Sequence, residues 1–207
     1  MVHLLTLPSM QFLEVNLRDS IILSGIRFYE RNGFTEMMKT IESPLHMEVT
    51  LLRVTIDNAK EIHAMQVDAF KELLQKYQDY DTNPGNESVE KVEARLKQRF
   101  TYYYFICVGQ QKVGAVRIVD KKEAGINKRI SPIFILPEYQ QQGIAQRAIQ
   151  LCEELHGNQN WELDTIMQEP RNCYLYEKMG YRQTGRTKVI NEKLTLVFYE
   201  KKEDSGR

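Results

Sequence analysis

The chain has 207 residues, and its 28 lysines and arginines balance 28 aspartates and glutamates. This zero net charge excludes nucleic acid or an acidic membrane surface as the expected partner, because both are bound by clusters of basic residues. A hydrophobic fraction of 42% with 10% aromatic residues excludes a disordered chain. The length allows one large domain, or one domain with an added fragment.

The cysteines and the apolar runs indicate the cellular setting. Cys107, Cys152 and Cys173 are widely spaced and odd in number, and the histidines are scattered, so we predict buried reduced thiols without a disulfide framework or a metal site. No apolar run approaches the roughly 20 residues of a membrane span, and the N-terminus lacks the basic region and cleavage site of a signal peptide. We therefore expect a cytoplasmic protein.

The first predicted elements are a strand and two helices. Alternating and β-branched residues predict a strand over 47–54, and apolar residues at helical spacing predict a helix after it. The run Asp-Thr-Asn-Pro-Gly-Asn at 81–86 predicts a loop. A second helix is expected next, with an apolar stripe formed by Val89, Val92, Leu96 and Phe100.

Three strands are predicted in succession over 101–108, 113–119 and 130–136, the first two joined by a connection of hairpin length. The third strand contains Pro132, which has no N–H group to donate to a sheet ladder and therefore predicts a bulge or an edge. A bulge at this position would open a gap between this strand and the strand expected at 161–167.

The last part of the chain alternates between helices and strands. We predict a helix over 143–155, the strand at 161–167, a helix over 172–179 and two final strands. The final strands are expected at 181–187 and 193–201. The complete order is β-α-α-β-β-β-α-β-α-β-β, which indicates an α/β (α+β) fold with a mixed sheet and helices on its faces.

The N-terminal residues resemble a later part of the same chain. Residues 25–34 (GIRFYERNGF) are similar to residues 172–181 (NCYLYEKMGY), at a constant offset of 147. We therefore predict two parts, namely 1–46 as a partial repeat of the last quarter of the domain, and 47–207 as the complete domain. Chance similarity between two amphipathic helix–strand units is the alternative. A partial sheet would expose strand edges, so we expect 1–46 to dock on the main domain or on a second copy, giving a homodimer.

The stretch Pro137–Ala145 carries the clearest chemical signal. A buried strand leads into a loop with Gly143, and a helix begins at once. Unpaired backbone N–H groups converge at such a helix start, where the helix dipole also favours anions, so this stretch could bind a pyrophosphate. An ordinary helix start is the alternative interpretation of these residues.

These features resemble the GNAT superfamily of acyl-CoA N-acyltransferases. Its loop pattern is matched by Gln140, Gly143 and Ala145, and its Tyr-x-x-x-Gly-Phe/Tyr pattern by Tyr176 and Gly180 with the tyrosine that follows. The resemblance covers about 47–201 and implies a mixed, mostly antiparallel central sheet with helices on both faces. Gln141 stands where the family often has Gly, and the family's frequent Asn falls near Glu169.

The resemblance also implies the cosubstrate and its contacts. Acetyl-CoA would bind to main-chain groups of one strand, to the following loop and to one residue of the next helix, without a metal. These implied binding residues are Phe134, Ile135, Gln140, Gln141, Gln142, Gly143, Ile144, Ala145, Gln146 and Asn172.

The expected function is transfer of an acetyl group from acetyl-CoA to a primary amine of a small molecule, peptide or protein, by direct attack in a ternary complex. Tyr176 matches the family's general acid, and its phenol is protonated at neutral pH. Glu162 and Asp164 share one face of a strand beside the expected gap, so either could be the general base; a structural ion pair is the alternative for both. The loop at 76–88 and the turn near 187–192 should border the acceptor. The alternative function is a catalytically weak or inactive CoA-binding or assembly module with the same fold.

Overall fold

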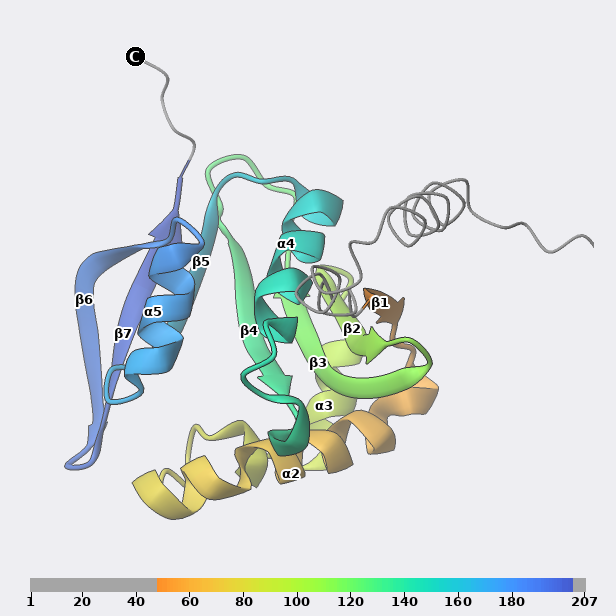
Figure 1. Ribbon diagram of the computed structural model, residues 1–207, viewed down its shortest axis with the longest axis horizontal. Helices are drawn as coiled ribbons and strands as arrows, with labels where there is room; N and C mark the ends of the chain where they lie inside the picture. Colours follow the sequence, from red (N-terminus) through yellow and green to blue (C-terminus); the bar gives the residue numbers. More distant parts are fainter. Residues whose placement is uncertain (1–47, 203–207) are drawn as a thin grey trace, which may run out of the picture. The chain divides into compact units, whose positions relative to one another are not determined.

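The computed structural model describes residues 48–202, drawn in colour in Figure 1. The predicted partial repeat at 1–46, and the homodimer contact assigned to it, lie outside these residues. Cys107 and Cys152 are free and buried as expected, whereas Cys173 is free but only half-buried. Within the described part of the chain, no helix is both long and apolar enough to cross a membrane.

A single sheet of seven strands forms the centre of the described residues, in the order β1-β2-β3-β4-β5-β7-β6. Only the β4–β5 pair is parallel, and the other neighbouring pairs are antiparallel, so the expected mixed, mostly antiparallel sheet is confirmed. The strands are β1 (Val49–Arg53), β2 (Thr101–Val108), β3 (Gln111–Val119), β4 (Lys128–Ile135), β5 (Trp161–Ile166), β6 (Arg182–Asn191) and β7 (Leu194–Lys201).

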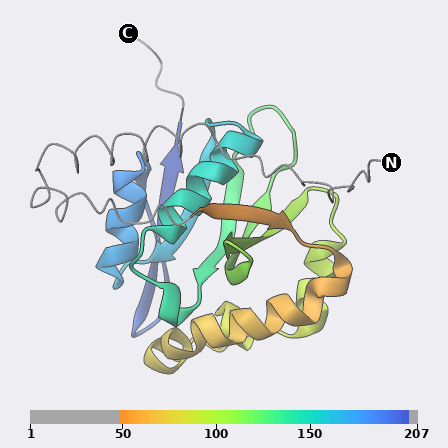
Figure 2. The ribbon, with the colours of Figure 1, turned by 45° about the vertical axis from the view of Figure 1, so that its right-hand side comes forward.

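Helices cover both faces of the sheet, as Figures 1 and 2 show. Alternate residues of a strand point to opposite faces, so Tyr103 and Phe105 of β2 pack with α2 and α3, while Ile106 packs with α4. The α-helices are α2 (Ala59–Tyr77), α3 (Val89–Leu96), α4 (Ile144–His156) and α5 (Pro170–Lys178), with short 3-10 turns η2 (Ile56–Asn58), η3 (Pro84–Asn86) and η4 (Pro137–Tyr139).

Several predicted boundaries differ from the structure by two residues or more. The second helix, α3, ends at Leu96 rather than near Phe100, because the chain turns at Gln98 to enter β2, where Thr101 N–H donates to Gln98 O at 3.2 Å. The β2–β3 connection is only two residues long, with Gly109 at φ +56°. Strand β6 continues to Asn191 instead of ending at 187, so the β6–β7 turn lies later in the chain.

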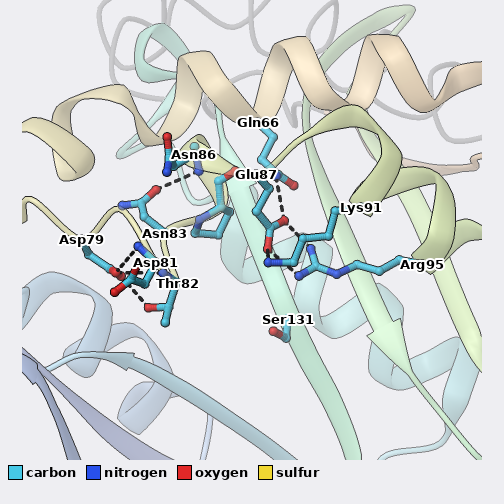
Figure 3. A network of polar contacts seen from close by, with 12 residues as sticks. Gln66, Asp79, Asp81, Thr82, Asn83, Asn86, Glu87, Lys91, Arg95 and Ser131 are labelled. Carbon is cyan, nitrogen blue, oxygen red and sulfur yellow. Dashed lines mark hydrogen bonds and ion pairs between the residues drawn. The ribbon is translucent and has the colours of Figure 1, made fainter.

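The loop between α2 and α3 is held by buried polar contacts, shown in Figure 3. The Glu87 side chain, only 5% exposed, accepts hydrogen bonds from Arg95 and, at 3.2 Å, from Gln66 Nε2. Burial alone would raise the pKa of Glu87, but the hydrogen bonds that Glu87 accepts from Arg95 and Lys91 lower it. Asp79 Oδ1 accepts from Thr82 N–H at 2.8 Å. The stretch predicted as a loop from its helix breakers is thus held at its two ends by the side chains of Asp79 and Glu87.

Candidate active site

Strands β4 and β5 separate after a short parallel ladder. Their ladder contains only two residue pairs, Lys128 with Trp161 and Arg129 with Glu162. The pairing of β4 with β3 shifts at Ser131 and Pro132, which together stand opposite Arg117, and Arg117 Nη1 donates to the Ser131 carbonyl at 2.6 Å. The bulge and the gap predicted from Pro132 are therefore confirmed. Beyond the bulge, β4 has no ladder partner on β5.

The start of α4 presents free backbone donors. Gly143 precedes the helix at φ +77°, and a Cβ there would meet no heavy atom within 4 Å. Arg147 N–H donates to Gly143 O at 3.1 Å, so the amides of 144–146 precede the first intrahelical bond. Gln140 Nε2 donates to Ile135 O at 3.0 Å, which fastens the loop to the end of β4. The resulting cradle is open, rich in donors and at the positive end of a helix.

A cavity of about 570 Å³ joins this cradle to α2 and α5. Its lining comes from β4, the β4–α4 loop, the first turn of α4 and the facing sides of α2 and α5. The lining residues are Ala69, Phe70, Glu72, Leu73, Lys76, Ile133, Phe134, Ile135, Pro137, Tyr139, Gln140, Gln141, Gly143, Ile144, Ala145, Gln146, Glu169, Arg171, Asn172, Leu175 and Tyr176.

Tyr176 supplies a buried phenol to the same cavity. It is 7% exposed, and its ring packs against Tyr181 and Tyr199 with centroids 6.1 and 6.0 Å away. Burial raises the pKa of Tyr176 to about 12, so the hydroxyl keeps its proton at neutral pH. The hydroxyl makes no hydrogen bond with any residue that the structure describes, and is therefore free to donate one to a ligand.

The family follows from a comparison with known sequences. A model of the GNAT acetyltransferase domain matches residues 60–203, which is more than half of the chain. The chain belongs to the GNAT acetyltransferase family. No curated protein matches the chain significantly.

Solved structures share the GNAT fold at low sequence identity. An acetyltransferase from Thermus thermophilus is 15% identical with a TM-score of 0.57, over 76% of this chain and 99% of that one. A spermidine N-acetyltransferase from Vibrio cholerae, in complex with CoA and spermine, is 17% identical with a TM-score of 0.59, over 73% and 94%. The ribosomal L7/L12 alpha-N-protein acetyltransferase RimL, in complex with CoA, is 13% identical with a TM-score of 0.59, over 79% and 98%.

Most residues to which the GNAT resemblance assigns acetyl-CoA contacts lie together in the cavity lining. The exception is Gln142, which is exposed and donates from Nε2 to Glu138 O at 3.3 Å. Gln141 adopts φ +62°, a left-handed conformation that glycine adopts without strain, which gives a physical reason for the Gly that the family often has here. The binding roles of these residues remain predictions.

Glu162 and Asp164 are placed differently from Tyr176. They share one face of β5, as predicted, but neither lines the cavity. Both are paired with Arg129, whose Nη1 lies 3.0 Å from Glu162 Oε1 and whose Nη2 contacts Asp164 Oδ1. This arrangement favours the ion-pair alternative, and the role of either residue as a base remains a prediction.

The sequence did not single out the wall that α2 contributes. Phe70 and Leu73 belong to an apolar helical stripe that packs and lines the cavity at once, and such a stripe gives no separate signal for a ligand. Lys76 of this wall and Glu169 at the start of α5 are joined by a salt bridge of 2.7 Å. The two residues are 93 positions apart, so nothing in local sequence indicates that they meet. Only the match of Glu169 to the position of the family's frequent Asn indicates from sequence that this residue lies near the site.

Proposed function

We propose that this GNAT protein transfers the acetyl group of acetyl-CoA to a primary amine by direct attack in a ternary complex. The observation that carries the proposal is that one cavity contains both the free amides at the start of α4 and the buried phenol of Tyr176. The free amides can donate hydrogen bonds to a pyrophosphate, and the phenol can donate one to a departing thiolate.

In this proposal acetyl-CoA is bound mainly by backbone groups. The pyrophosphate lies at the cradle that begins at Gly143, where the amides of 144–146 have no intrahelical acceptor. Arg171 lines the same cavity, and within the described residues it has no ion pair, so its charge is available to a phosphate. The extended arm of the cosubstrate lies in the gap beyond the bulge, beside the part of β4 that has no β5 partner.

The chemical step requires attack by the amine and departure of the thiolate of CoA. The amine nitrogen attacks the thioester carbon, and collapse of the resulting oxyanion breaks the carbon–sulfur bond. The Tyr176 hydroxyl donates a hydrogen bond to the sulfur as its negative charge develops. A thiol, with a pKa of about 8.5, is a stronger acid than this phenol, so Tyr176 stabilises the thiolate without having to give up its proton.

The amine must lose a proton before or during the attack, since a free alkylamine is mostly protonated at pH 7. We propose that a carboxylate accepts this proton through water, and three carboxylates are candidates. Glu162 and Asp164 lie next to the closed end of the gap, paired with Arg129. Glu72 lines the cavity and has no ion pair with any described residue. Separate substitution of each by its amide, with a pH profile of kcat, identifies the base as the variant that loses the acidic limb of that profile.

The acceptor in this proposal is a primary amine of a small molecule or of a peptide. The structural neighbours include a spermidine N-acetyltransferase and a ribosomal-protein alpha-N-acetyltransferase, so both a small amine and a peptide N-terminus are reasonable acceptors. A first panel should therefore contain spermidine, spermine, aminoglycosides, amino acids and peptides with free N-termini.

Calorimetry with acetyl-CoA and a thiol-release assay over this amine panel test the proposal together. We expect acetyl-CoA binding, and thiol release that depends on at least one amine. Binding without thiol release would favour the alternative of a CoA-binding or assembly module. Absence of acetyl-CoA binding would refute both functions.

A further inference from the structure

A pair of charged residues connects two walls of the cavity. Glu169 Oε1 accepts hydrogen bonds from Lys76 Nζ at 2.7 Å and from Tyr77 Oη at 2.6 Å. Lys76 and Tyr77 end helix α2, whereas Glu169 directly precedes α5. Lys76 and Glu169 both line the cavity, and Tyr77 is 3% exposed. We name the contact among these three residues the α2–α5 tie.

The tie acts directly on the helix that carries Tyr176. The Glu169 carbonyl accepts hydrogen bonds from the amides of Asn172 at 3.0 Å and Cys173 at 3.3 Å, so Glu169 is part of the first turn of α5. Its side chain therefore fixes the start of α5 to α2, while its backbone fixes the same residue to the helix. A displacement of Glu169 would therefore be transmitted through these two hydrogen bonds to the first turn of α5.

The tie stands at the open end of the gap between β4 and β5. The two ladder pairs of these strands lie at the N-terminal end of each, and Glu169 follows the C-terminal end of β5. A second set of contacts supports the same end of α2, since Asn191 Nδ2 donates to Tyr77 O at 3.0 Å and Lys193 Nζ donates to Gln78 Oε1 at 2.8 Å. Figure 1 shows this end of α2 next to the β6–β7 turn.

We propose that Lys76, Tyr77 and Glu169 are positioning residues that set the width of the β4–β5 gap, and through it the affinity for CoA. The inference rests on the proposed function, since it takes the gap to be the CoA site. The sheet strands on the two sides of the gap share only two ladder pairs, so the tie adds an attachment across the gap and preorganises the cavity. The Lys76 side chain is 58% exposed and that of Glu169 is 22% exposed, and an exposed ion pair without a positioning role would contribute little and leave CoA binding unchanged.

Lys76 and Glu169, the two ionisable partners in the salt bridge of the tie, both carry their charge at neutral pH. The hydrogen bond that Lys76 donates to Glu169 raises the pKa of Lys76 to about 12. Burial by itself would raise the pKa of Glu169, but the hydrogen bonds from Lys76 and Tyr77 outweigh it and lower that pKa. The contact is thus a charge-assisted hydrogen bond over the whole range of an enzyme assay.

Calorimetric titration of the full chain with CoA tests this proposal. We expect Lys76→Met and Glu169→Gln each to raise the Kd for CoA about five-fold, as the loss of one charge-assisted contact would. The control Lys71→Met removes an exposed lysine of the same helix outside the cavity lining, and should leave the Kd unchanged. The double variant Lys76→Glu with Glu169→Lys restores the pair with its charges exchanged, and should return the Kd to within about two-fold of the original.

The double variant separates positioning from direct contact. If Lys76 bound a phosphate of CoA itself, the exchanged pair would bind CoA as weakly as the single variants, and the proposal would be overturned. Hydrogen exchange supplies a reading without ligand, in which the amides of Asn172 and Cys173 should exchange faster in the single variants than in Lys71→Met.

Two further outcomes contradict the proposal. Unchanged CoA affinity in both single variants would show that the tie is an ordinary surface pair. If either variant fails to fold, Tyr77→Phe replaces it, because this change removes only the hydrogen bond from Tyr77 to Glu169. An unchanged Kd for CoA and unchanged amide exchange in Tyr77→Phe would also contradict the proposal. Absence of CoA binding by the unaltered chain refutes the proposed function itself, so the two failures are distinguishable.

Discussion

The two ends of helix α4 are built in opposite ways. At the N-terminal end, Gly143 opens onto free space and the amides of 144–146 precede the first intrahelical bond. At the C-terminal end, the His156 side chain is 4% exposed, with Nδ1 3.2 Å from Asp120 Oδ2 and Nε2 3.0 Å from Tyr104 Oη. Trp161 Nε1 donates to Gly157 O at 2.8 Å beside it.

This difference distinguishes polar groups that are available to a ligand from polar groups that stabilise the fold. The closed end pairs its buried polar atoms with one another, as a stable interior requires. Because a carboxylate only accepts hydrogen bonds, Nδ1 of His156 carries the proton toward Asp120, and Nε2 accepts from the Tyr104 hydroxyl. The open end leaves donors unpaired, and such donors are useful only when a ligand supplies the acceptors. Substitutions at the closed end should therefore change stability, and those at the cavity should change binding or turnover.

The largest effect, a loss of stability, is expected at the C-terminal end of α4. His156→Ala removes a buried ring and both of its side-chain hydrogen bonds, so we expect the free energy of unfolding to fall by about 3 kcal/mol. Urea denaturation measures this change. The control Leu155→Ala changes a side chain that is 62% exposed on the same helix, and should change stability by less than about 0.5 kcal/mol. A loss of CoA affinity in folded His156→Ala, without a loss of stability, would contradict the division between the two ends.

The next effect is expected at the cavity, for Tyr176→Phe. Loss of the donor to the thiolate should lower kcat about 100-fold, with little change in the Kd for acetyl-CoA. Tyr181→Phe is the matched control, because Tyr181 Oη donates to Glu153 Oε1 at 2.9 Å in the interior and does not line the cavity. That variant should lose stability and keep its turnover. Equal turnover in Tyr176→Phe and the unaltered chain would show that Tyr176 is not the donor.

A smaller effect is expected for Gly143→Ala at the open end of α4. The new Cβ would project into the cradle, and we expect the affinity for CoA to fall about ten-fold, which corresponds to about 1.4 kcal/mol. Gly125→Ala is a close control, because Gly125 has φ +78° and likewise meets no heavy atom within 4 Å. Both variants should therefore lose about 1–2 kcal/mol of stability from backbone strain, and only Gly143→Ala should also lose affinity. Similar affinity for CoA in the two variants would show that CoA does not bind at the start of α4.

The sequence predicted those parts of the fold whose signals are local. The helix of α4 ends at a glycine and the strand β5 has an alternating pattern, so both were found within a residue or two of their bounds. Pro132 indicated the bulge because the missing N–H group is a property of one residue. The end of α3 was placed too late because Phe100 continues an apolar period after the chain has already turned toward β2.

The candidate site was predicted on one side only. The cradle and Tyr176 lie in short motifs, whereas the opposite wall depends on how α2 packs across the sheet. Phe70 and Leu73 give the same apolar pattern at helical spacing whether they face a solid core or a cavity, so the pattern does not indicate a cavity. The contact of Lys76 with Glu169 joins residues 93 positions apart, and no local pattern encodes such a pairing.

The smallest predicted effect is a pH dependence of stability from the closed end of α4. Burial lowers the pKa of His156, with Lys122 and Arg53 lowering it further, and the hydrogen bond to Asp120 offsets only part of this. The unfolded chain, in which a histidine has a pKa of about 6.5, then binds a proton first as the pH falls. The free energy of unfolding should therefore decrease as the pH falls below about 6.5 toward the lower pKa of folded His156.

Urea denaturation at pH values of about 7.5 and about 5.5, on either side of the ordinary histidine pKa, measures this pH dependence, and His156→Gln is the variant to compare with the unaltered chain. The difference in stability between the two pH values should be smaller in the variant, because its side chain does not titrate. Other histidines contribute equally to both proteins and cancel in the comparison. Asp120 does not imitate the effect: burial alone would raise its pKa, but Lys122 and His156 lower it, so its carboxylate stays charged over this range. An equal pH dependence in the two proteins would mean that His156 binds its proton as readily in the folded chain as in the unfolded one.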